Sequence, residues 1–378
     1  MKILVNLSNL KMGGALQVAY SFLVELLSLK SNEHEFHVVL SKELENEFID
    51  KEGGVFSKFK VYKLQNQPAY AFKGKKARKE LDNLENLIKP SCVFSVFGPT
   101  YWKPKTIHVA GFAAGWTINP DSIAFDVLSF KEKIKKKFQN KIKLKSSVSE
   151  TDLFIVETEV VRQRLNKYGK VSLGNIHVVG NTYGNQYNQK IDIESFKLPP
   201  KSNENEFRLV TISANYPHKN LKILCKLVDV LKNRKVNVKF YVTLKENEYN
   251  SLFKNYDDYI VNLGHVKVQD CPAVYKQCDA LFLPTLLESF TASYVEAMIM
   301  ELPILTSDID FARNLCGEAA LYFNPLDAKD IADKIELLIS DKTIFENLVT
   351  QGSLKIKDYP TAKERAQSYI SVCEKVIK

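Results

Sequence analysis

Short apolar runs alternate with helical patterns from one end of the chain to the other. In the first half these runs have the length and composition of buried strands. They are residues 3–6, 35–40, 59–64, 93–96, 106–112, 152–157 and 176–179. A second series comprises residues 207–213, 236–244, 260–263, 280–283, 304–306 and 321–323. Strands that alternate with helices predict an α/β protein with doubly wound parallel sheets.

Helical patterns fill several of the intervals between these runs. They cover residues 15–29, 131–145, 221–234, 272–277, 328–339 and 361–377. Pro272 stands in the first turn of its helix, and Asp327 is placed to cap the helix that follows it. The chain therefore contains two successive sets of strands and helices.

The two sets predict two domains, and 378 residues with 45% hydrophobic content are enough to bury two cores. Residues 188–206 are polar and include a Pro-Pro pair, which is typical of an exposed linker. We therefore expect an N-terminal Rossmann-like domain at residues 1–187 and a C-terminal one at residues 207–360. Residues 361–378 form a last helix.

Residues 284–303 form the stretch around which the second domain is organised. Apolar strands precede and follow it, so the order is strand, loop, helix and strand. The helix is expected to begin near Thr291, with Ser289 or Thr291 capping its free N–H groups. Glu288 in the loop and Glu296 on the helix flank this start. A helix N-terminus at the carboxyl end of a parallel strand binds anions and sugars in α/β proteins, so we expect the active edge here.

Two other loops carry residues suited to a phosphorylated ligand. Lys219 lies in the strand-to-helix loop at residues 213–221, where it is either a solvated lysine or a cation for a diphosphate. This loop and the loop after Pro284 should share the carboxyl edge of one sheet, which favours the second interpretation. Gly13 and Gly14 follow the first strand, where paired glycines allow close approach of the backbone to a phosphate or sugar.

The net charge of +9 and the pI near 9.0 suit nucleic acid, an anionic membrane surface or phosphate-rich substrates. No nucleic-acid-binding motif is recognisable. The longest apolar runs are shorter than the roughly 18 to 20 residues of a spanning helix, and the N-terminus lacks the apolar core of a signal peptide, so we expect a cytosolic protein. The six cysteines are scattered, without histidines at metal-ligand spacing, which predicts reduced core thiols and no metal site.

Residues 130–145 predict a basic amphipathic helix. Phe130, Ile134, Phe138 and Ile142 recur every four residues among many lysines. Either this apolar stripe packs on its own domain, or the helix binds an anionic membrane surface, to which each nearby lysine contributes about 1 kcal/mol. This segment is therefore the candidate contact with the inner face of a cell membrane.

The spacing Glu288-x7-Glu296, with Pro284 before it and Pro303 after it, resembles the signature of the retaining family 4 glycosyltransferases, the glycosyl transferases group 1. Similar segments recur in order across nearly the whole chain. They are Gly13-Gly14, residues 152–158, 176–181 and 218–221, Leu263-Gly264, and residues 317–325. The resemblance implies the GT-B fold, in which two Rossmann-like doubly wound domains face each other across a cleft and the final helix returns to the N-terminal domain.

The same resemblance implies roles for individual residues. The second domain would hold the nucleotide sugar, with Lys219 on the diphosphate, Glu288 on the hydroxyls of the donor hexose and Glu296 on the ribose. Other donor contacts would come from Gly13, Gly14, Gly264, His265, Val266, Ser289, Phe290, Thr291 and Ala292. The first domain would bind the acceptor. No cofactor besides the donor substrate is implied.

The chain departs from the family pattern near these residues. The Arg that usually precedes the lysine by five residues is Ala214, so half of the cationic clamp is missing or is supplied by a residue such as Asn215 or His218. Two positions that are usually glycine are Thr291 and Glu301. These departures suggest a distinct subgroup, while both carboxylates are kept.

The reaction implied is transfer of a hexose, with retention of anomeric configuration, to a glycan or lipid-linked oligosaccharide in bacterial surface polysaccharide synthesis. Lys219 and helix N-termini, rather than a metal, would stabilise the departing diphosphate. The family's first-domain histidine, which contacts the donor sugar, corresponds to His108. The alternative for His108 is a satisfied structural histidine.

Three other functions stay open. A metal-dependent GT-A transferase would use Asp308 and Asp310 as its Asp-x-Asp motif, although Asp308 is better placed to cap the next helix. A non-catalytic membrane-associated or nucleic-acid-binding protein would use the scaffold and its positive charge alone. A nucleotide-sugar epimerase of similar fold would act on the donor without an acceptor.

Overall fold

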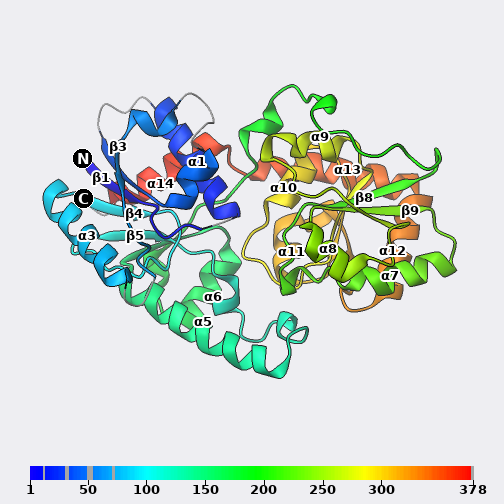
Figure 1. Cartoon of the computed structure of the whole chain (residues 1–378), viewed down its shortest axis with the longest axis horizontal. Coiled ribbons are helices and arrows are strands. Elements are labelled where there is room, and N and C mark those ends of the chain that lie inside the picture. The colour runs from blue at the N-terminus through cyan, green and yellow to red at the C-terminus, as the bar shows by residue number, and fades with distance from the viewer. Residues whose placement is uncertain (12, 30–33, 49–53, 70–72, 376–378) are drawn as a thin grey trace. The chain divides into compact units, whose positions relative to one another are not determined.

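The computed structural model describes residues 1–11, 13–29, 34–48, 54–69 and 73–375 (Figure 1). Within this part of the chain, helices cover both faces of two separate parallel sheets. The predicted α/β class, with two doubly wound sheets, is confirmed.

Contacts divide the chain into two compact units. The first comprises Met1–Pro120, Lys131–Gly184 and Pro360–Lys378, and the second comprises Asp121–Phe130 and Asn185–Tyr359. Residues 121–130, which the sequence placed in the N-terminal domain, therefore group with the second unit. The predicted domain boundaries stay a prediction, since contacts group residues without marking where a domain ends.

The first unit is built on a seven-stranded parallel sheet in the order β3-β2-β1-β4-β5-β6-β7. Its strands are β1 (Lys2–Asn6), β2 (Glu35–Leu40), β3 (Lys60–Lys63), β4 (Cys92–Ser95), β5 (His108–Gly111), β6 (Leu153–Val156) and β7 (Ile176–Val178). Its helices are α1 (Gly14–Ser28), α2 (Lys42–Phe48), α3 (Lys73–Ile88), α4 (Gly115–Ile118), α5 (Phe130–Glu150), α6 (Glu159–Gly169) and α14 (Ala362–Lys375).

Successive residues of β1 face opposite sides of the sheet and enter different cores. Ile3 packs in a cluster with Phe22 of α1 and Tyr369 of α14, whose rings lie 5.7 Å apart. Leu4 packs in another cluster with Leu81 of α3. The last helix is thus part of the first unit, which is where the resemblance to the GT-B proteins puts it.

The second unit is built on a six-stranded parallel sheet in the order β10-β9-β8-β11-β12-β13. Its strands are β8 (Phe207–Thr211), β9 (Val238–Val242), β10 (Ile260–Asn262), β11 (Ala280–Leu283), β12 (Ile304–Ser307) and β13 (Ala320–Phe323). Its α-helices are α7 (Ile223–Asn233), α8 (Glu246–Phe253), α9 (Cys271–Lys276), α10 (Ala292–Ile299), α11 (Asp310–Cys316), α12 (Ala328–Ser340) and α13 (Lys342–Lys355). Asp327 caps α12 as predicted, accepting from the N–H groups of Lys329 and Asp330.

The polar segment at residues 188–206 is only partly the exposed linker that its composition predicts. Leu198 and Glu206 are buried. The Leu198 N–H donates to the side chain of Gln277 over 3.0 Å, and the Gln277 amide donates to the Phe196 carbonyl. This stretch therefore packs against the end of α9 in the second unit.

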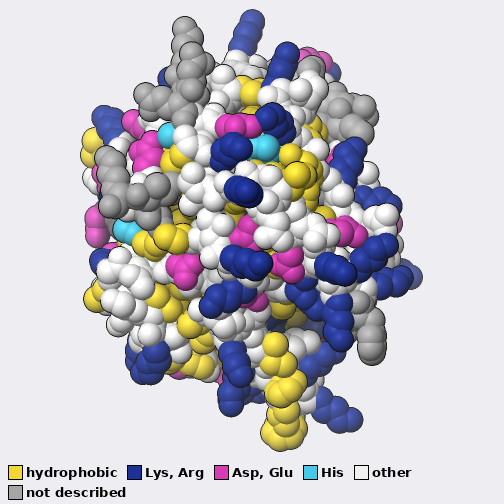
Figure 2. Space-filling model, turned by 90° about the vertical axis from the view of Figure 1, so that its left-hand side faces the viewer, with side chains coloured by type: hydrophobic (Ala, Val, Ile, Leu, Met, Phe, Trp, Pro, Cys, Tyr) yellow, Lys and Arg dark blue, Asp and Glu magenta, His cyan; other side chains and the backbone are white. Residues whose placement is uncertain are grey.

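The apolar stripe of α5 does not pack on the protein, so the structural interpretation of the stripe is wrong. The exposed fractions are 77% for Phe130, 56% for Ile134, 65% for Phe138 and 49% for Ile142. Figure 2 shows exposed hydrophobic side chains among dark-blue Lys and Arg at the lower end of the molecule, where Figure 1 places α5. None of the helices in the described ranges is long and apolar enough to cross a membrane.

The six cysteines are free thiols, as predicted, and all but Cys225 are buried. The end of α10 holds one backbone position that favours glycine. Glu301 has a φ of 57°, and its N–H donates to the Met298 carbonyl while the Leu302 N–H donates to Ala297. This is a Schellman C-terminus, in which glycine usually occupies the left-handed position. The glycine that the family pattern has here thus has a structural reason.

Replacing Glu301 with glycine is expected to raise the free energy of unfolding by about 1 kcal/mol, because glycine adopts the left-handed conformation without steric cost. Urea denaturation monitored by circular dichroism measures the change. Glu318→Gly is the matched control, since Glu318 is also exposed but is not among the residues with positive φ. An equal gain in both variants would contradict this explanation.

Candidate active site

The candidate site lies where the strand order of the second sheet reverses. β8 pairs with β9 on one side and with β11 on the other, so the loops after β8 and β11 diverge from neighbouring strand ends. Ligands of open α/β sheets bind at such a position. The two loops touch: the Leu286 N–H donates to the His218 carbonyl over 2.7 Å, and Thr285 Oγ1 lies 3.1 Å from the same oxygen. The predicted convergence of these loops is confirmed.

Lys219 and Glu288 form an ion pair at this junction. Lys219 Nζ lies 2.5 Å from Glu288 Oε1, and the Thr285 hydroxyl donates to the same carboxylate oxygen over 3.0 Å. The side chains are 13% and 12% exposed. A cation and an anion are thus held together at the edge of the sheet, each accessible to a ligand with complementary groups.

The loop that carries Lys219 is fixed by its neighbours. Pro217–Lys219 form a short 3-10 helix, and Asn220 follows with a φ of 55°. The buried Asn220 amide donates to the Pro325 carbonyl over 2.8 Å, which ties the loop to the segment after β13. Lys219 therefore projects from a well-defined backbone.

The N-terminus of α10 lies directly after the Glu288 loop. Thr291 occupies the N-cap position, but its side chain makes no capping hydrogen bond. Of the two residues expected to cap this helix, Thr291 is therefore wrong, and capping by Ser289 stays a prediction. The helix itself is firmly anchored, because the buried Tyr294 hydroxyl lies 2.6 Å from Thr306 Oγ1 on β12. The first-turn N–H groups of a helix are the groups that bind an anion at such a position.

Glu296 is partly buried and lies against α9. Its Oε2 accepts a 3.0 Å hydrogen bond from the hydroxyl of Tyr275, a side chain that is fully buried. Burial raises the pKa of the Glu296 carboxyl to about 7, although the hydroxyls of Tyr275 and Tyr187 act in the opposite direction. These two tyrosines could not be found from the sequence, because a tyrosine in an apolar pattern looks like an ordinary core residue.

The third predicted loop of this sheet follows β10. Gly264 has a φ of +66°, and its N–H donates to the Asn262 side chain over 3.2 Å. A side chain is strained in that conformation, which explains the glycine. His265 is exposed and Val266 is buried. These residues lie at the same carboxyl edge as Lys219 and Glu288, and their contact with a base stays a prediction.

In the first unit, the glycine pair lies at the carboxyl end of β1. Gly13 has a φ of +68° and stands at the N-cap of α1, and Gly14 is the first residue of that helix. Apart from the chain neighbours and the backbone of α1, no atom of the described residues lies within 4 Å of the position that a Cβ would take on either residue. The backbone is therefore open to close approach there, as predicted.

His108 is a satisfied core histidine. It is 1% exposed, its Nε2 lies 2.8 Å from Ser95 Oγ and its Nδ1 lies 2.7 Å from the Glu150 carbonyl. Burial lowers its pKa to about 4, so the ring is neutral. Because both ring nitrogens are occupied inside the first unit, the structure favours the structural alternative over a catalytic His108.

The position of the missing clamp arginine, Ala214, lies near a histidine that contacts an aromatic ring. The His218 ring stacks on Tyr216, with centroids 5.6 Å apart and planes 8° from parallel. Asn215 is partly exposed beside Ala214. A role for His218 or Asn215 in place of the arginine stays a prediction.

The first aspartate of the Asp-x-Asp motif pairs with an arginine. Asp308 forms two hydrogen bonds with Arg313, of 2.7 and 2.8 Å, and the N-cap of α11 is Ile309. The expectation that Asp308 caps this helix is therefore wrong, and the arginine lowers the pKa of the Asp308 carboxyl. Within the described ranges no three His, Cys, Asp or Glu side chains are grouped to hold a metal ion.

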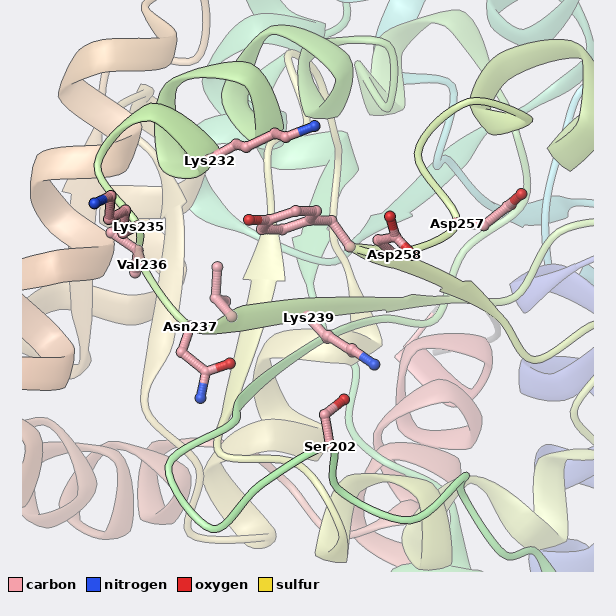
Figure 3. Close-up of a pocket in the computed structure, with 10 residues that line it drawn as sticks. Ser202, Lys232, Lys235, Val236, Asn237, Lys239, Asp257 and Asp258 are labelled. Atoms are coloured by element: carbon pink, nitrogen blue, oxygen red, sulfur yellow. The ribbon is translucent and has the colours of Figure 1, made fainter.

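A hollow of about 520 Å³ lies at the opposite edge of the sheet, near the amino ends of β9 and β10 (Figure 3). Lys232, Lys235, Lys239, Asp257 and Asp258 are among the residues that line it. Figure 3 shows the three lysine side chains pointing in different directions rather than toward one point. This hollow is neither at the switch point nor arranged for a single anion.

Comparison with known proteins identifies the second unit. Residues 206–341 match the family model of the glycosyl transferases group 1, and this range includes Lys219, Glu288 and Glu296. This part of the second unit is therefore similar to the glycosyl transferases group 1. The resemblance predicted from the Glu-x7-Glu spacing is confirmed, whereas assignment to family 4 and retaining chemistry stay predictions.

Two curated relatives are also described as enzymes that transfer sugars. The capsular polysaccharide biosynthesis glycosyltransferase CapM of Staphylococcus aureus is 24% identical over 213 residues, which are 53% of this chain and 54% of that protein. The O-antigen chain mannosyltransferase RfbU of Salmonella typhimurium is 24% identical over 220 residues, covering 55% and 58% of the two proteins. The chain thus spans little more than half the length of these curated relatives.

Solved structures establish the fold along the whole chain. A glycosyltransferase from Rickettsia africae superposes with a TM-score of 0.72 at 14% identity, covering all of this chain and 98% of the other. A UDP-N-acetylglucosamine 2-epimerase superposes with a TM-score of 0.59 at 13% identity, covering 98% and 94%. The chain has the GT-B architecture, which transferases and epimerases share, so the fold alone does not separate these activities.

Proposed function

We propose that this protein is a retaining glycosyltransferase that moves a hexose from a nucleotide-diphosphate sugar to a glycan or lipid-linked oligosaccharide. The acceptor would belong to a bacterial surface polysaccharide, by analogy with the capsule and O-antigen relatives. The reaction uses no cofactor and no metal ion, and the protein works in the cytoplasm at the inner face of the membrane.

The observation that carries this proposal is the ion pair of Lys219 and Glu288 beside the N-terminus of α10, within the group 1 domain. A nucleotide sugar carries a diphosphate next to a ring of hydroxyl groups. The site offers an ammonium group and helix N–H groups for the diphosphate, and a carboxylate for the sugar hydroxyls. The two kinds of recognition are at adjacent points, as they are in the donor.

The proposed transfer requires the bond between the sugar and the diphosphate to break while an acceptor hydroxyl forms the new bond from the same face of the ring. Negative charge then builds on the diphosphate, where Lys219 and the α10 N–H groups stabilise it more strongly than in the ground state. Glu288 fixes the hexose by accepting hydrogen bonds from its hydroxyls. The acceptor proton leaves with the diphosphate or solvent.

A screen of nucleotide sugars by thermal shift, followed by transfer assays with the donors that bind, tests this function. We expect stabilisation that grows with the logarithm of donor concentration. We also expect release of nucleoside diphosphate only when a lipid-linked or glycan acceptor is added, and full activity in EDTA. Loss of activity in EDTA with rescue by Mn²⁺ would contradict the metal-free mechanism.

The epimerase is the second candidate function, since a structure of that activity shares the fold. An epimerase changes the sugar of the donor without any acceptor. Nuclear magnetic resonance of the donor after incubation with the protein alone therefore separates the two. A changed sugar in the absence of acceptor would replace the transferase proposal.

The proposed membrane contact rests on α5. Its four exposed apolar side chains lie among lysines. The apolar side chains can insert into the lipid while the lysines are attracted to anionic headgroups, so both contributions favour binding. Lys136 is less available to lipid headgroups, because its ammonium group lies 4.5 Å from the centre of the Trp116 ring. A lipid-linked acceptor would also be found at such a surface.

Replacing Ile134 and Phe138 together by serine is expected to weaken binding to vesicles that contain anionic lipid by at least tenfold, because two large apolar side chains no longer insert. Vesicle sedimentation measures this. Leu87→Ser is the matched control, since Leu87 of α3 is 74% exposed but lies outside the basic stripe. Equal binding of wild type to anionic and neutral vesicles would dismiss the contact.

A further inference from the structure

Glu296 lies among titratable side chains that are neutral at working pH. The titratable side chains that act on it are Tyr187, in a 3-10 helix (Asn185–Asn188) of the second unit, and Tyr275 and Cys271 of α9. Burial raises the pKa of each of these three groups, so all of them are neutral at working pH. Glu296 is thus the group of this cluster that changes charge near neutrality.

Two buried tyrosines pack beside the Glu296 carboxylate. The rings of Tyr187 and Tyr275 lie 6.1 Å apart, and both side chains are buried. The Tyr275 hydroxyl donates to Glu296 Oε2 over 3.0 Å, and the Ser293 side chain on the first turn of α10 faces the same hydroxyl. A neutral phenol in this position donates at every working pH.

One carboxylate oxygen is therefore held by protein, and a carboxylate has enough lone pairs to accept further hydrogen bonds from a ligand. We propose that Tyr275 is a positioning residue: its hydroxyl holds Glu296 as an ionised acceptor for the vicinal hydroxyls of the nucleoside sugar of the donor. This inference rests on the proposed function, and it adds a residue that the family spacing does not contain.

The positioning role makes donor binding depend on pH. The folded-state pKa of about 7 lies above the ordinary 4.5, so folding favours the protonated carboxyl. The stability that this group contributes is complete below about pH 4.5 and is lost as the pH rises through 7. Donor binding has the opposite dependence, because the ionised form is the better acceptor for two hydroxyls.

Calorimetric titration with UDP and with GDP between pH 6 and pH 9 tests the proposal. For the nucleotide that binds, we expect affinity of the wild type to fall as the pH drops below about 7. In Tyr275→Phe the Glu296 carboxylate loses this hydrogen-bond donor, which raises the pKa of Glu296 further. Affinity should then be at least threefold weaker at pH 7 but within twofold of wild type at pH 9. Glu296→Gln should bind weakly with no pH dependence in this range.

Tyr241→Phe is the matched control. Tyr241 is also a buried tyrosine whose hydroxyl donates to a buried carboxylate, that of Glu206, over 3.1 Å. Glu206 lies before β8, at the amino edge of the sheet, so this variant should follow the wild type at every pH. A Tyr275→Phe curve that has the wild-type midpoint, or that is weakened equally at all pH values, would overturn the positioning role.

A measurement without ligand separates this inference from the proposed function. The difference in melting temperature between the wild type and Glu296→Gln, followed from pH 5 to pH 8, reports the titration of Glu296 alone. Tyr275→Phe should move that titration to higher pH, and an unmoved titration would overturn the inference. A moved titration together with failure of both nucleotides to bind would uphold the contact but reject the donor function.

Discussion

Replacing Lys219 with methionine is expected to lower the rate of sugar transfer by roughly 10²- to 10³-fold, the usual cost of removing one group that stabilises charge in a transition state. Methionine keeps most of the length of the side chain and removes its charge. The departing diphosphate then has the helix N–H groups but loses the ammonium group of this loop. Initial rates at saturating donor measure the effect.

Lys222→Met is the control for this variant, since Lys222 is exposed at the start of α7, three residues further along the chain. It should keep wild-type activity. The melting temperature of Lys219→Met must be measured as well, because Glu288 loses its ionic partner. An active Lys219→Met enzyme would show that the leaving group is stabilised elsewhere.

Replacing Glu288 with glutamine is expected to reduce transfer by about 10- to 100-fold. A hydrogen bond to a charged group contributes about 1.5–3 kcal/mol, and each 1.4 kcal/mol corresponds to a factor of ten. Glutamine has the same shape but presents one oxygen and one NH₂ group to the hexose hydroxyls. Both kcat and kcat/KM should fall if the contact strengthens in the transition state.

Glu301→Gln serves as the control for the Glu288 variant, because Glu301 is an exposed carboxylate at the opposite end of α10. Its transfer rate should equal that of the wild type. Circular dichroism of both variants establishes that the fold is kept. Unchanged transfer by a folded Glu288→Gln protein would remove Glu288 from the donor site.

The sheets could be predicted from the sequence because parallel strands buried on both faces are short, continuous apolar runs. Glu35–Leu40 and Ala280–Leu283 match their predicted bounds to the residue. Helices such as α3 and α13 were not located, since their polar faces dominate: α3 is rich in lysine, and only Leu348 and Gly352 of α13 are buried. Amphipathic helices with a narrow buried face give a weak apolar pattern.

The site could be predicted only where loop position determines function. The joining of the Lys219 and Glu288 loops followed from strand connectivity alone. Their direct ion pair did not, because connectivity places loops but not side-chain atoms. His108 was assigned to the right strand, yet its burial between Ser95 and Glu150 depends on neighbours distant in sequence. The packing of Tyr187 and Tyr275 beside Glu296 could not be predicted for the same reason.

The pairing of Lys219 with Glu288 also gives the proposed site a means of discrimination. An anion that binds Lys219 alone takes away the partner of Glu288 and leaves that carboxylate facing a second negative charge. A nucleotide sugar brings hydroxyl groups that satisfy the carboxylate at the same time. Inorganic phosphate should therefore compete poorly with the donor. Once the hexose has been transferred, the nucleoside diphosphate loses this advantage, so the re-formed ion pair favours product release.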